Sequence, residues 1–139
     1  MLIKRALVAA ALLVLGSQCG TAQIVAPKTS GGCINVADMD ARVTVTGRLT
    51  VVTVTDEFGT ERPFILELPS PVCVDDGGDF ADPAKKFAQV HVSGTNDKML
   101  RALRKAVGRR VTVSGEGFAA HTRHHHRPLV VLADQITVR

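Results

Sequence analysis

The segment from His121 to Arg127 holds the densest group of side chains able to do chemistry, with four of the five histidines of the chain. Neutral imidazoles are good ligands for zinc, copper and nickel. If the segment is extended, His124 and His126 share one face and His121 and His125 share the other. Two histidines on one face make half of a metal site, so we predict His124 and His126 as ligands for Zn, Cu or Ni.

Two other interpretations of this segment stay open. It can form a polar loop whose side chains hydrogen-bond to backbone carbonyls or to water. Alternatively, Arg123 and Arg127 can form, with the histidines, a rim that recognises an acidic group, and the imidazole charge would then rise below about pH 6.5. A complete metal site would need His91, an acidic residue such as Asp56 or Glu116, or a ligand from a second molecule. The candidate ligand-binding residues are Arg62, His121, Arg123, His124, His126 and Arg127.

No group of catalytic residues stands out in the sequence. A Gly-x-Ser-x-Gly turn and a pair of catalytic carboxylates are both missing. The acidic loop at 75–82 does not have the ligand spacing of a calcium-binding EF-hand, so a solvated turn is the better interpretation. We therefore predict that the protein is not an enzyme and name no catalytic residue.

Five strand-like runs and one helix must position the His-rich segment. The strands are expected at 43–54, 63–68, 88–93, 109–115 and 128–138, with the helix at 97–107. A single helix between the third and fourth strands is the element order of the OB-fold. We predict a mainly β fold, a five-stranded OB-fold-like barrel, in which the loops at 55–62 and 121–127 form facing walls of a ligand cleft.

Breaks in the alternating pattern predict irregularities within these strands. The apolar phase slips at Val51–Val52, which suggests a bulge or a strong bend. Pro69 and Pro71 are expected to end the second strand, because proline cannot donate to a strand ladder. The last strand is expected to break at Ala133–Asp134.

The N-terminus has the pattern of a cleaved secretory signal peptide. A short basic region precedes the apolar run 6–15, and small residues end at Ala22. We expect a signal peptide at 1–22, a flexible leader and entry segment at 23–40, and an OB-fold-like domain at 41–139. Lipid anchoring at Cys19 is less expected, because the residue before it is not small. The predicted location is periplasmic or secreted, in a bacterium.

The cysteines and the overall composition further limit the compartment and the kinds of partner that the protein can have. Removal of Cys19 with the signal leaves Cys33 and Cys73, an even count in an oxidising compartment, so we predict a disulfide between them. The apolar run is too short to span a bilayer, so an integral membrane protein is not expected. The five Phe are the only aromatic residues and the formal charge of the whole chain is only +4, which makes nucleic acid an unlikely partner.

Several motifs together give the chain a family resemblance. They are a Val/Thr-rich first strand (43–55), a Cys after the second strand (69–73), the run Val111–Gly115, and the His-rich turn 122–128 before an apolar strand. On these motifs the chain resembles small secreted bacterial OB-fold-type proteins of unknown function, from Cys33 to Val138. The resemblance implies the barrel and export, and it implies no reaction or ligand.

The sequence therefore predicts a non-catalytic periplasmic or secreted binding module. Its partner would be a protein or an envelope glycan, held against the barrel face and the two loops. The alternative is a metal-binding protein that uses the His121–His126 cluster.

Overall fold

The computed structural model describes residues 32–139. The predicted signal peptide at 1–22, Cys19 and the leader up to residue 31 lie outside the described residues. The elements are β1 (Ile34–Asn35), β2 (Arg42–Val51), β3 (Val54–Asp56), β4 (Gly59–Glu61), β5 (Phe64–Val72), β6 (Val74–Asp75), β7 (Phe87–Gly94), α1 (Asp97–Ala106), β8 (Arg110–Ala119) and β9 (Leu129–Val138). No helix among these residues is long and apolar enough to cross a membrane.

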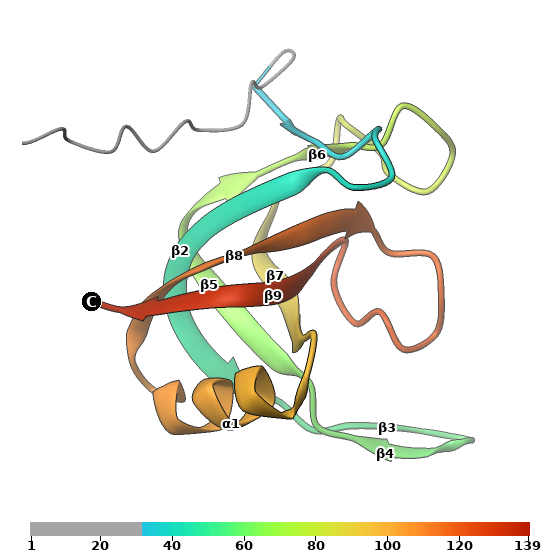
Figure 1. Cartoon of the computed structure of the whole chain (residues 1–139). Coiled ribbons are helices and arrows are strands. Elements are labelled where there is room, and N and C mark those ends of the chain that lie inside the picture. The colour runs from blue at the N-terminus through green and yellow to red at the C-terminus, as the bar shows by residue number, and fades with distance from the viewer. Residues whose placement is uncertain (1–31) are drawn as a thin grey trace, which may run out of the picture.

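Five strands close into a barrel in the order β2-β5-β7-β9-β8, and β8 pairs back with β2 (Figure 1). All neighbours are antiparallel except β7 and β9, which run parallel. The helix α1 comes between β7 and β8 in the chain and packs at one end of the barrel (Figure 1). This connectivity is that of an OB-fold, so the predicted fold class is confirmed.

Alternation along the strands builds the core. Val43, Val45 and Leu49 of β2 point inward and are buried. The residues between them point outward, where Thr44 hydrogen-bonds to Ser114 across the β2–β8 pair at 2.8 Å. The apolar face of α1 completes the core from below, and a backbone N–H of its first turn is capped by the Asn96 side chain.

Two glycines allow the strands to pack closely. A Cβ on Gly47 would lie 2.2 Å from the Glu67 carbonyl oxygen, and one on Gly115 would lie 1.9 Å from that of Leu132. At Gly115 the pairing with β9 also skips Asp134, which leaves a bulge. The predicted break in the last strand is confirmed in this form.

Two expectations about the second strand and the loop before it were wrong. β5 continues through Pro69 and Pro71 as far as Val72. The ladder between β5 and β7 is interrupted between Glu67 and Val72, so the missing proline N–H groups cost no ladder hydrogen bond. The loop at 55–62 contains most of a two-stranded hairpin, β3–β4, which begins after the phase slip at the end of β2.

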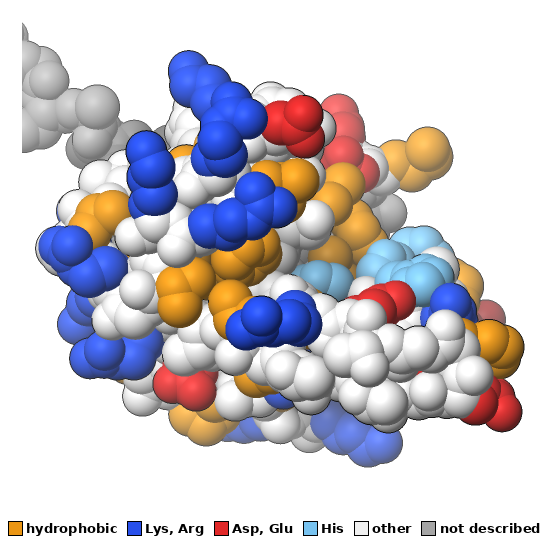
Figure 2. All heavy atoms as spheres, turned by 90° about the horizontal axis from the view of Figure 1, so that it is seen from below, with side chains coloured by type: hydrophobic (Ala, Val, Ile, Leu, Met, Phe, Trp, Pro, Cys, Tyr) orange, Lys and Arg blue, Asp and Glu red, His pale blue; other side chains and the backbone are white. Residues whose placement is uncertain are grey.

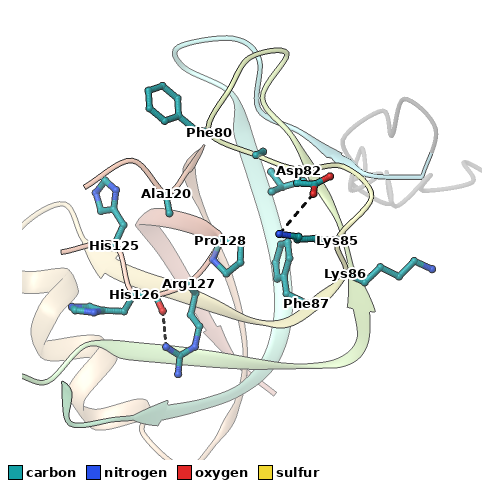
Figure 3. Close-up of a pocket in the computed structure, with 12 residues that line it drawn as sticks. Phe80, Asp82, Lys85, Lys86, Phe87, Ala120, His125, His126, Arg127 and Pro128 are labelled. Carbon is teal, nitrogen blue, oxygen red and sulfur yellow. Dashed lines mark hydrogen bonds and ion pairs between the residues drawn. The ribbon is translucent and has the colours of Figure 1, made fainter. Parts of the chain in front are cut away.

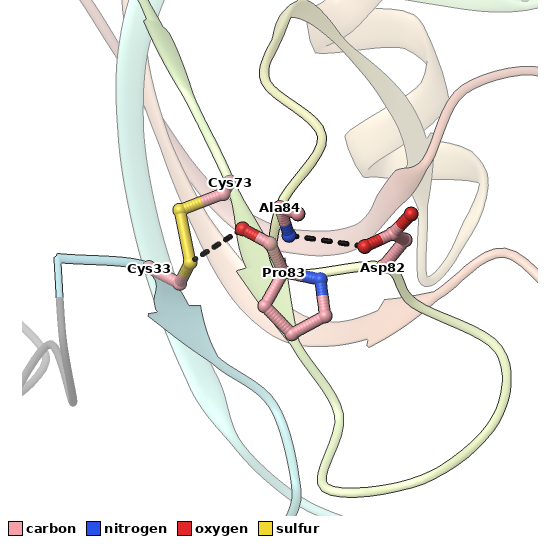
Figure 4. The surroundings of a disulfide bond; sticks show 5 residues. All are labelled: Cys33, Cys73, Asp82, Pro83 and Ala84. Carbon is pink, nitrogen blue, oxygen red and sulfur yellow. Dashed lines mark hydrogen bonds between the residues drawn. A yellow bond between two sulfur atoms is a disulfide. The ribbon is translucent and has the colours of Figure 1, made fainter.

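The predicted disulfide is confirmed. Cys33 and Cys73 are bonded, with their Cα atoms 4.6 Å apart, next to the parallel pair β1–β6 (Figure 4). Ile34 and Val36 follow the bridge into the hydrophobic core, with exposed fractions of 9% and 5%. The packed domain therefore begins before residue 41, within the segment that we expected to be a leader.

Candidate functional site

The His-rich loop at 120–128 folds into a compact turn between β8 and β9. The backbone N–H of His125 donates to the Thr122 carbonyl at 3.1 Å. In return, the Nδ1 atom of His125 accepts the backbone N–H groups of His121 and Thr122 at 3.1 and 3.3 Å. Burial, followed by the charges of neighbouring histidines, lowers the pKa of His125. The neutral ring of His125 is therefore part of what shapes the turn.

Glu61 of the β3–β4 hairpin joins this loop through two histidines. Its carboxylate contacts Nδ1 of His124 and, at 2.5 Å, Nε2 of His126. A carboxylate offers only acceptor atoms, so each imidazole donates its N–H. These hydrogen bonds, first from His126 and then from His124, hold the pKa of Glu61 below its usual range.

Arg123 adds a second connection between the same two segments. Its guanidinium lies 3.5 Å from the Asp56 carboxylate and 4.3 Å from the centre of the Phe58 ring. A cation over an aromatic face is attractive, although exposed contacts of this kind are individually weak. We call the six residues the mouth clamp: Asp56, Phe58 and Glu61 on the hairpin, and Arg123, His124 and His126 on the loop.

The loop also covers part of the outer surface of the barrel. Ile65 and Val130 alternate with core residues and lie on either side of His91, yet their exposed fractions are 0% and 1%. The backbone N–H of His126 donates to Nδ1 of His91 at 3.3 Å, and the two rings lie 5.5 Å apart. Burial, and then the charges of His126 and His125, lower the pKa of His91 to about 4. The cleft that we predicted between the two loops is closed here by direct contacts.

An open hollow lies on the other side of the His-rich loop. It has a volume of about 520 Å³ and lies between this loop and the segment 80–87 (Figure 3). Phe80, Phe87 and Pro128 provide apolar walls, and Lys85 pairs with Asp82 at 3.9 Å. The lining includes three cationic side chains, Lys85, Lys86 and Arg127, against the single carboxylate of Asp82. We call this space the basic hollow.

Arg127 is the best-fixed cation of the basic hollow. Its Nε donates to the Gln89 side chain at 2.7 Å and its Nη1 donates to the His126 carbonyl at 2.5 Å. A guanidinium carries five N–H groups, so donors remain for an anion. By contrast, the Lys86 side chain extends away from the other labelled residues (Figure 3). Arg127 can therefore hold a carboxylate in a defined orientation.

The residues that we predicted as ligand-binding fall into four places. Arg123, His124 and His126 belong to the mouth clamp, and Arg127 lines the basic hollow. His121 donates from Nδ1 to the Ala119 carbonyl at 2.9 Å and lies against the rings of Phe80, Phe118 and His125. Arg62 lies apart from all of them, beside Arg104 and Val107 near α1.

Sequence reasoning missed Glu61 and the lysines of the basic hollow. Glu61 lies in the loop that was expected to face the histidines, but nothing in the spacing marks it above Asp56 or Glu57. Lys85 reaches the site because the segment before β7 lies beside the end of β8 and the start of β9. Both residues come from separate parts of the chain, so only the fold brings them to the His-rich loop.

Of the further metal ligands that we named, His91 and Asp56 have other partners, and the acidic residue that contacts His124 and His126 is Glu61. Asp56 pairs with Arg123, and Nδ1 of His91 accepts a backbone N–H. Within residues 32–139 no group of three or more His, Cys, Asp or Glu side chains is arranged to hold a metal ion. The binding of Zn, Cu or Ni by His124 and His126 stays a prediction.

In the acidic loop at 75–82, Asp75 and Asp76 accept the N–H groups of glycines that follow them, as turn residues do.

Comparisons with known proteins add a partial family match and several similar structures. A family model described as a domain of unknown function, DUF4431, matches residues 89–137. No curated protein matches the chain. A small single-stranded DNA-binding protein from Streptomyces coelicolor is 16% identical, with a TM-score of 0.41 over 72% of this chain and 93% of that one.

Two further solved structures have similar scores. An OBody bound to hen egg-white lysozyme is 17% identical, with a TM-score of 0.41 over 82% of this chain and 91% of that one. The single-stranded DNA-binding protein of Plasmodium falciparum, in complex with ssDNA, is 14% identical, with a TM-score of 0.36 over 70% and 91%. The OB-fold assignment made here rests on the strand order of the barrel itself.

Proposed function

We propose that this protein is a non-catalytic, exported binding module that holds an acidic segment of a partner protein in the basic hollow. The observation that carries the proposal is the combination of apolar walls with cations at one open site. Pockets of this composition use apolar surface for affinity and a few polar groups for orientation. By comparison, the hollow beside α1 is lined by one aromatic ring and two cations, Phe64, Arg62 and Arg104.

The mouth clamp supports this role by fixing one wall of the hollow in advance. His125 and His126 line the hollow and are also held by the turn and by Glu61. A preformed wall lowers the conformational entropy that the protein loses when a ligand binds. The clamp also covers Ile65 and Val130, on the face that OB-folds often use for ligands. The ligand is therefore expected on the far side of the loop from the hairpin.

The chemistry of the hollow defines the ligand. Arg127 suits a carboxylate, because a guanidinium and a carboxylate form paired hydrogen bonds. Phe80 and Phe87 suit a neighbouring apolar side chain. We therefore expect a peptide segment in which an Asp or Glu stands next to large apolar residues.

A displayed peptide library tests this proposal directly. The protein should enrich peptides with adjacent acidic and apolar residues, and Arg127→Gln with Lys85→Gln should weaken their binding at least about tenfold, because charge-assisted hydrogen bonds are lost. The matched control is Lys98→Gln with Arg101→Gln, which removes the same charge at α1. Enrichment of no peptide class, or equal binding by both double variants, would show that the hollow is not the site.

The metal-binding alternative has one observation in its favour. His124, His126 and Glu61 are in direct contact, and all three are groups that can ligate zinc. An ion that binds only the folded protein must raise its melting temperature. A metal-free preparation titrated with Zn, Cu and Ni should then show a stabilisation that His124→Gln removes. An unchanged melting curve with every ion would eliminate this alternative.

A further inference from the structure

The end of the barrel closed by α1 carries a dense group of basic side chains. Lys98, Arg101, Arg104 and Lys105 lie on the exposed side of the helix, opposite the buried Leu103. The neighbouring strands extend this group, because the Arg48 side chain reaches the Gly108 carbonyl at 2.8 Å. We call the whole group the helix-end basic face: Arg48, Arg62, Lys98, Arg101, Arg104, Lys105, Arg109 and Arg110.

This face keeps its charge uncompensated. All eight cations are exposed, and none of them forms an ion pair with a carboxylate of residues 32–139. The nearby carboxylates include Asp97 in the first turn of α1, Glu67 opposite Arg48 on β5, and Glu61, which precedes Arg62 and pairs with His124 and His126. Figure 2 views the molecule from this end, where Lys and Arg side chains are spread widely and Asp and Glu are scattered. The face therefore has a strong positive potential.

A hollow with an apolar floor lies within the face. Its lining consists of Val51, Phe64 and Val107 together with the two arginines Arg62 and Arg104, and its volume is about 530 Å³. No carboxylate lines it. Val107 is 40% exposed directly after the helix. Such a place fits an anionic group that is attached to an apolar segment.

The opposite end of the molecule carries the reverse charge. Asp38 and Asp40 follow β1, and Asp75, Asp76 and Asp79 lie in or after β6, on the far side of the barrel from α1 (Figure 1). An extended anionic surface would therefore attract the helix end and repel the other end. This difference in charge between the two ends would orient the whole domain on such an anionic surface.

We propose that the helix-end basic face docks on a bilayer surface containing anionic phospholipids, with a lipid phosphate between Arg62 and Arg104. Clusters of this many Lys and Arg bind anionic lipid surfaces. The apolar floor beside the two arginines suits the glycerol and upper chain region of a lipid. Single-stranded nucleic acid is the weaker fit, since Phe64, the Phe that lines the hollow, is only partly exposed and offers a base little ring surface for stacking. Because the β3–β4 hairpin lies at the same end of the molecule as α1 (Figure 1), docking would also bring the hairpin close to the membrane.

Vesicle co-sedimentation of the chain from Gln23 onward, which contains every described residue, tests the proposal. The protein should bind vesicles of phosphatidylcholine with phosphatidylglycerol at low salt, and it should not bind phosphatidylcholine alone. Arg101→Gln with Lys105→Gln should reduce partitioning about fivefold for each cation removed. Arg62→Gln with Arg104→Gln should reduce it at least as much. The control Lys85→Gln with Lys86→Gln makes the same change in net charge and should reduce it less than about twofold.

Each other outcome has a clear meaning. Equal loss in the three double variants would show that binding follows net charge alone and would overturn the assignment to this face. Binding of inorganic phosphate at Arg62 and Arg104 without vesicle binding would make the hollow an anion site and overturn the lipid proposal. Tighter binding of a single-stranded DNA oligonucleotide than of vesicles, lost in Arg101→Gln with Lys105→Gln, would assign the face to nucleic acid. The variants change exposed side chains, and their melting curves report whether they are folded.

Discussion

The barrel body and the mouth clamp are neighbours in space, but they are held by different forces. The core of the barrel consists of fully buried aliphatic side chains, and no polar residue of the described part of the chain is buried. Most side chains of the clamp are partly exposed, that of His126 is only 9% exposed, and the contacts of both histidines depend on protonation. We infer that stability lies in the barrel and that the clamp only sets the position of the loop.

The largest loss of stability is expected on removing the disulfide, which lies at the end of the barrel opposite α1 (Figure 1). Replacing Cys33 and Cys73 with Ser removes a link across 40 positions, which the chain-entropy model values at about 4 kcal/mol. The measurement is the free energy of unfolding from urea titration, with the oxidised protein as reference. The loop contacts of the clamp should survive in the native state of the variant. If the contacts of the mouth clamp were lost in the native state of the variant, the stability of the barrel and the position of the loop would not be independent.

The next largest effect is expected at Gly115, where the β8 and β9 backbones meet. The added methyl group of Gly115→Ala would lie 1.9 Å from the Leu132 carbonyl oxygen, so the strands must move apart. Forcing extra volume into a packed region of this kind costs up to about 3 kcal/mol. Gly78→Ala is the control, because its methyl group meets nothing closer than 3.5 Å. Equal stability of the two variants would contradict the close packing described here.

Much of the barrel could be predicted from the sequence because each strand and the helix follow from a residue pattern that repeats within the element itself. Alternation of Val with Thr marks β2, helical spacing and Gly108 mark the extent of α1, and the loss of alternation marks the bulge at Asp134. The continuation of β5 through Pro69 could not be predicted, because it depends on an interruption in its neighbour's ladder. Local patterns determine an element, and its partners determine where it ends.

The site was less predictable for the same reason. The sequence places His124 and His126 on one face of an extended segment, but the segment folds as a turn, in which both side chains contact Glu61. The group itself, Glu61, is 63 residues away from His124 and carries no local signal. A pattern shows which side chains point together, but it does not show which distant side chain meets them.

Acidification should destabilise the folded protein through His91, the β7 residue that accepts the backbone N–H of His126. The pKa of His91 is lowered from 6.5 to about 4 in the folded protein, so between these values the unfolded chain binds more protons. Stability is therefore lost as the pH falls from 6.5 towards 4. The shift is equivalent to at most about 3 kcal/mol, and screening of the partly exposed ring reduces it to about 1 kcal/mol.

The variant His91→Gln isolates this effect. Glutamine keeps an acceptor for the His126 N–H but does not titrate, so the variant should lose much of the acid-induced destabilisation. The measurement is the free energy of unfolding as a function of pH in both proteins. The lowered pKa of His125 acts in the same direction and leaves a smaller residual slope. A variant as acid-sensitive as the parent would show that His91 is not the titrating group.

The smallest change in stability is expected for Glu61→Gln, where the change in loop motion should be large. Glutamine cannot accept both imidazole N–H groups through two oxygens, so at least one contact of the clamp is lost. The amide oxygen of glutamine can still accept the N–H of His126, whose side chain is only 9% exposed, and the pair with the more exposed His124 contributes little, so the free energy of unfolding should change by less than about 0.5 kcal/mol. Backbone hydrogen exchange at 121–126 should nevertheless become faster, because the turn loses its anchor to the hairpin. Glu116→Gln, the same substitution on the outer face of β8, should change neither quantity. A large loss of stability in Glu61→Gln alone would mean that the clamp is part of the folding unit, and the division between barrel and mouth would be wrong.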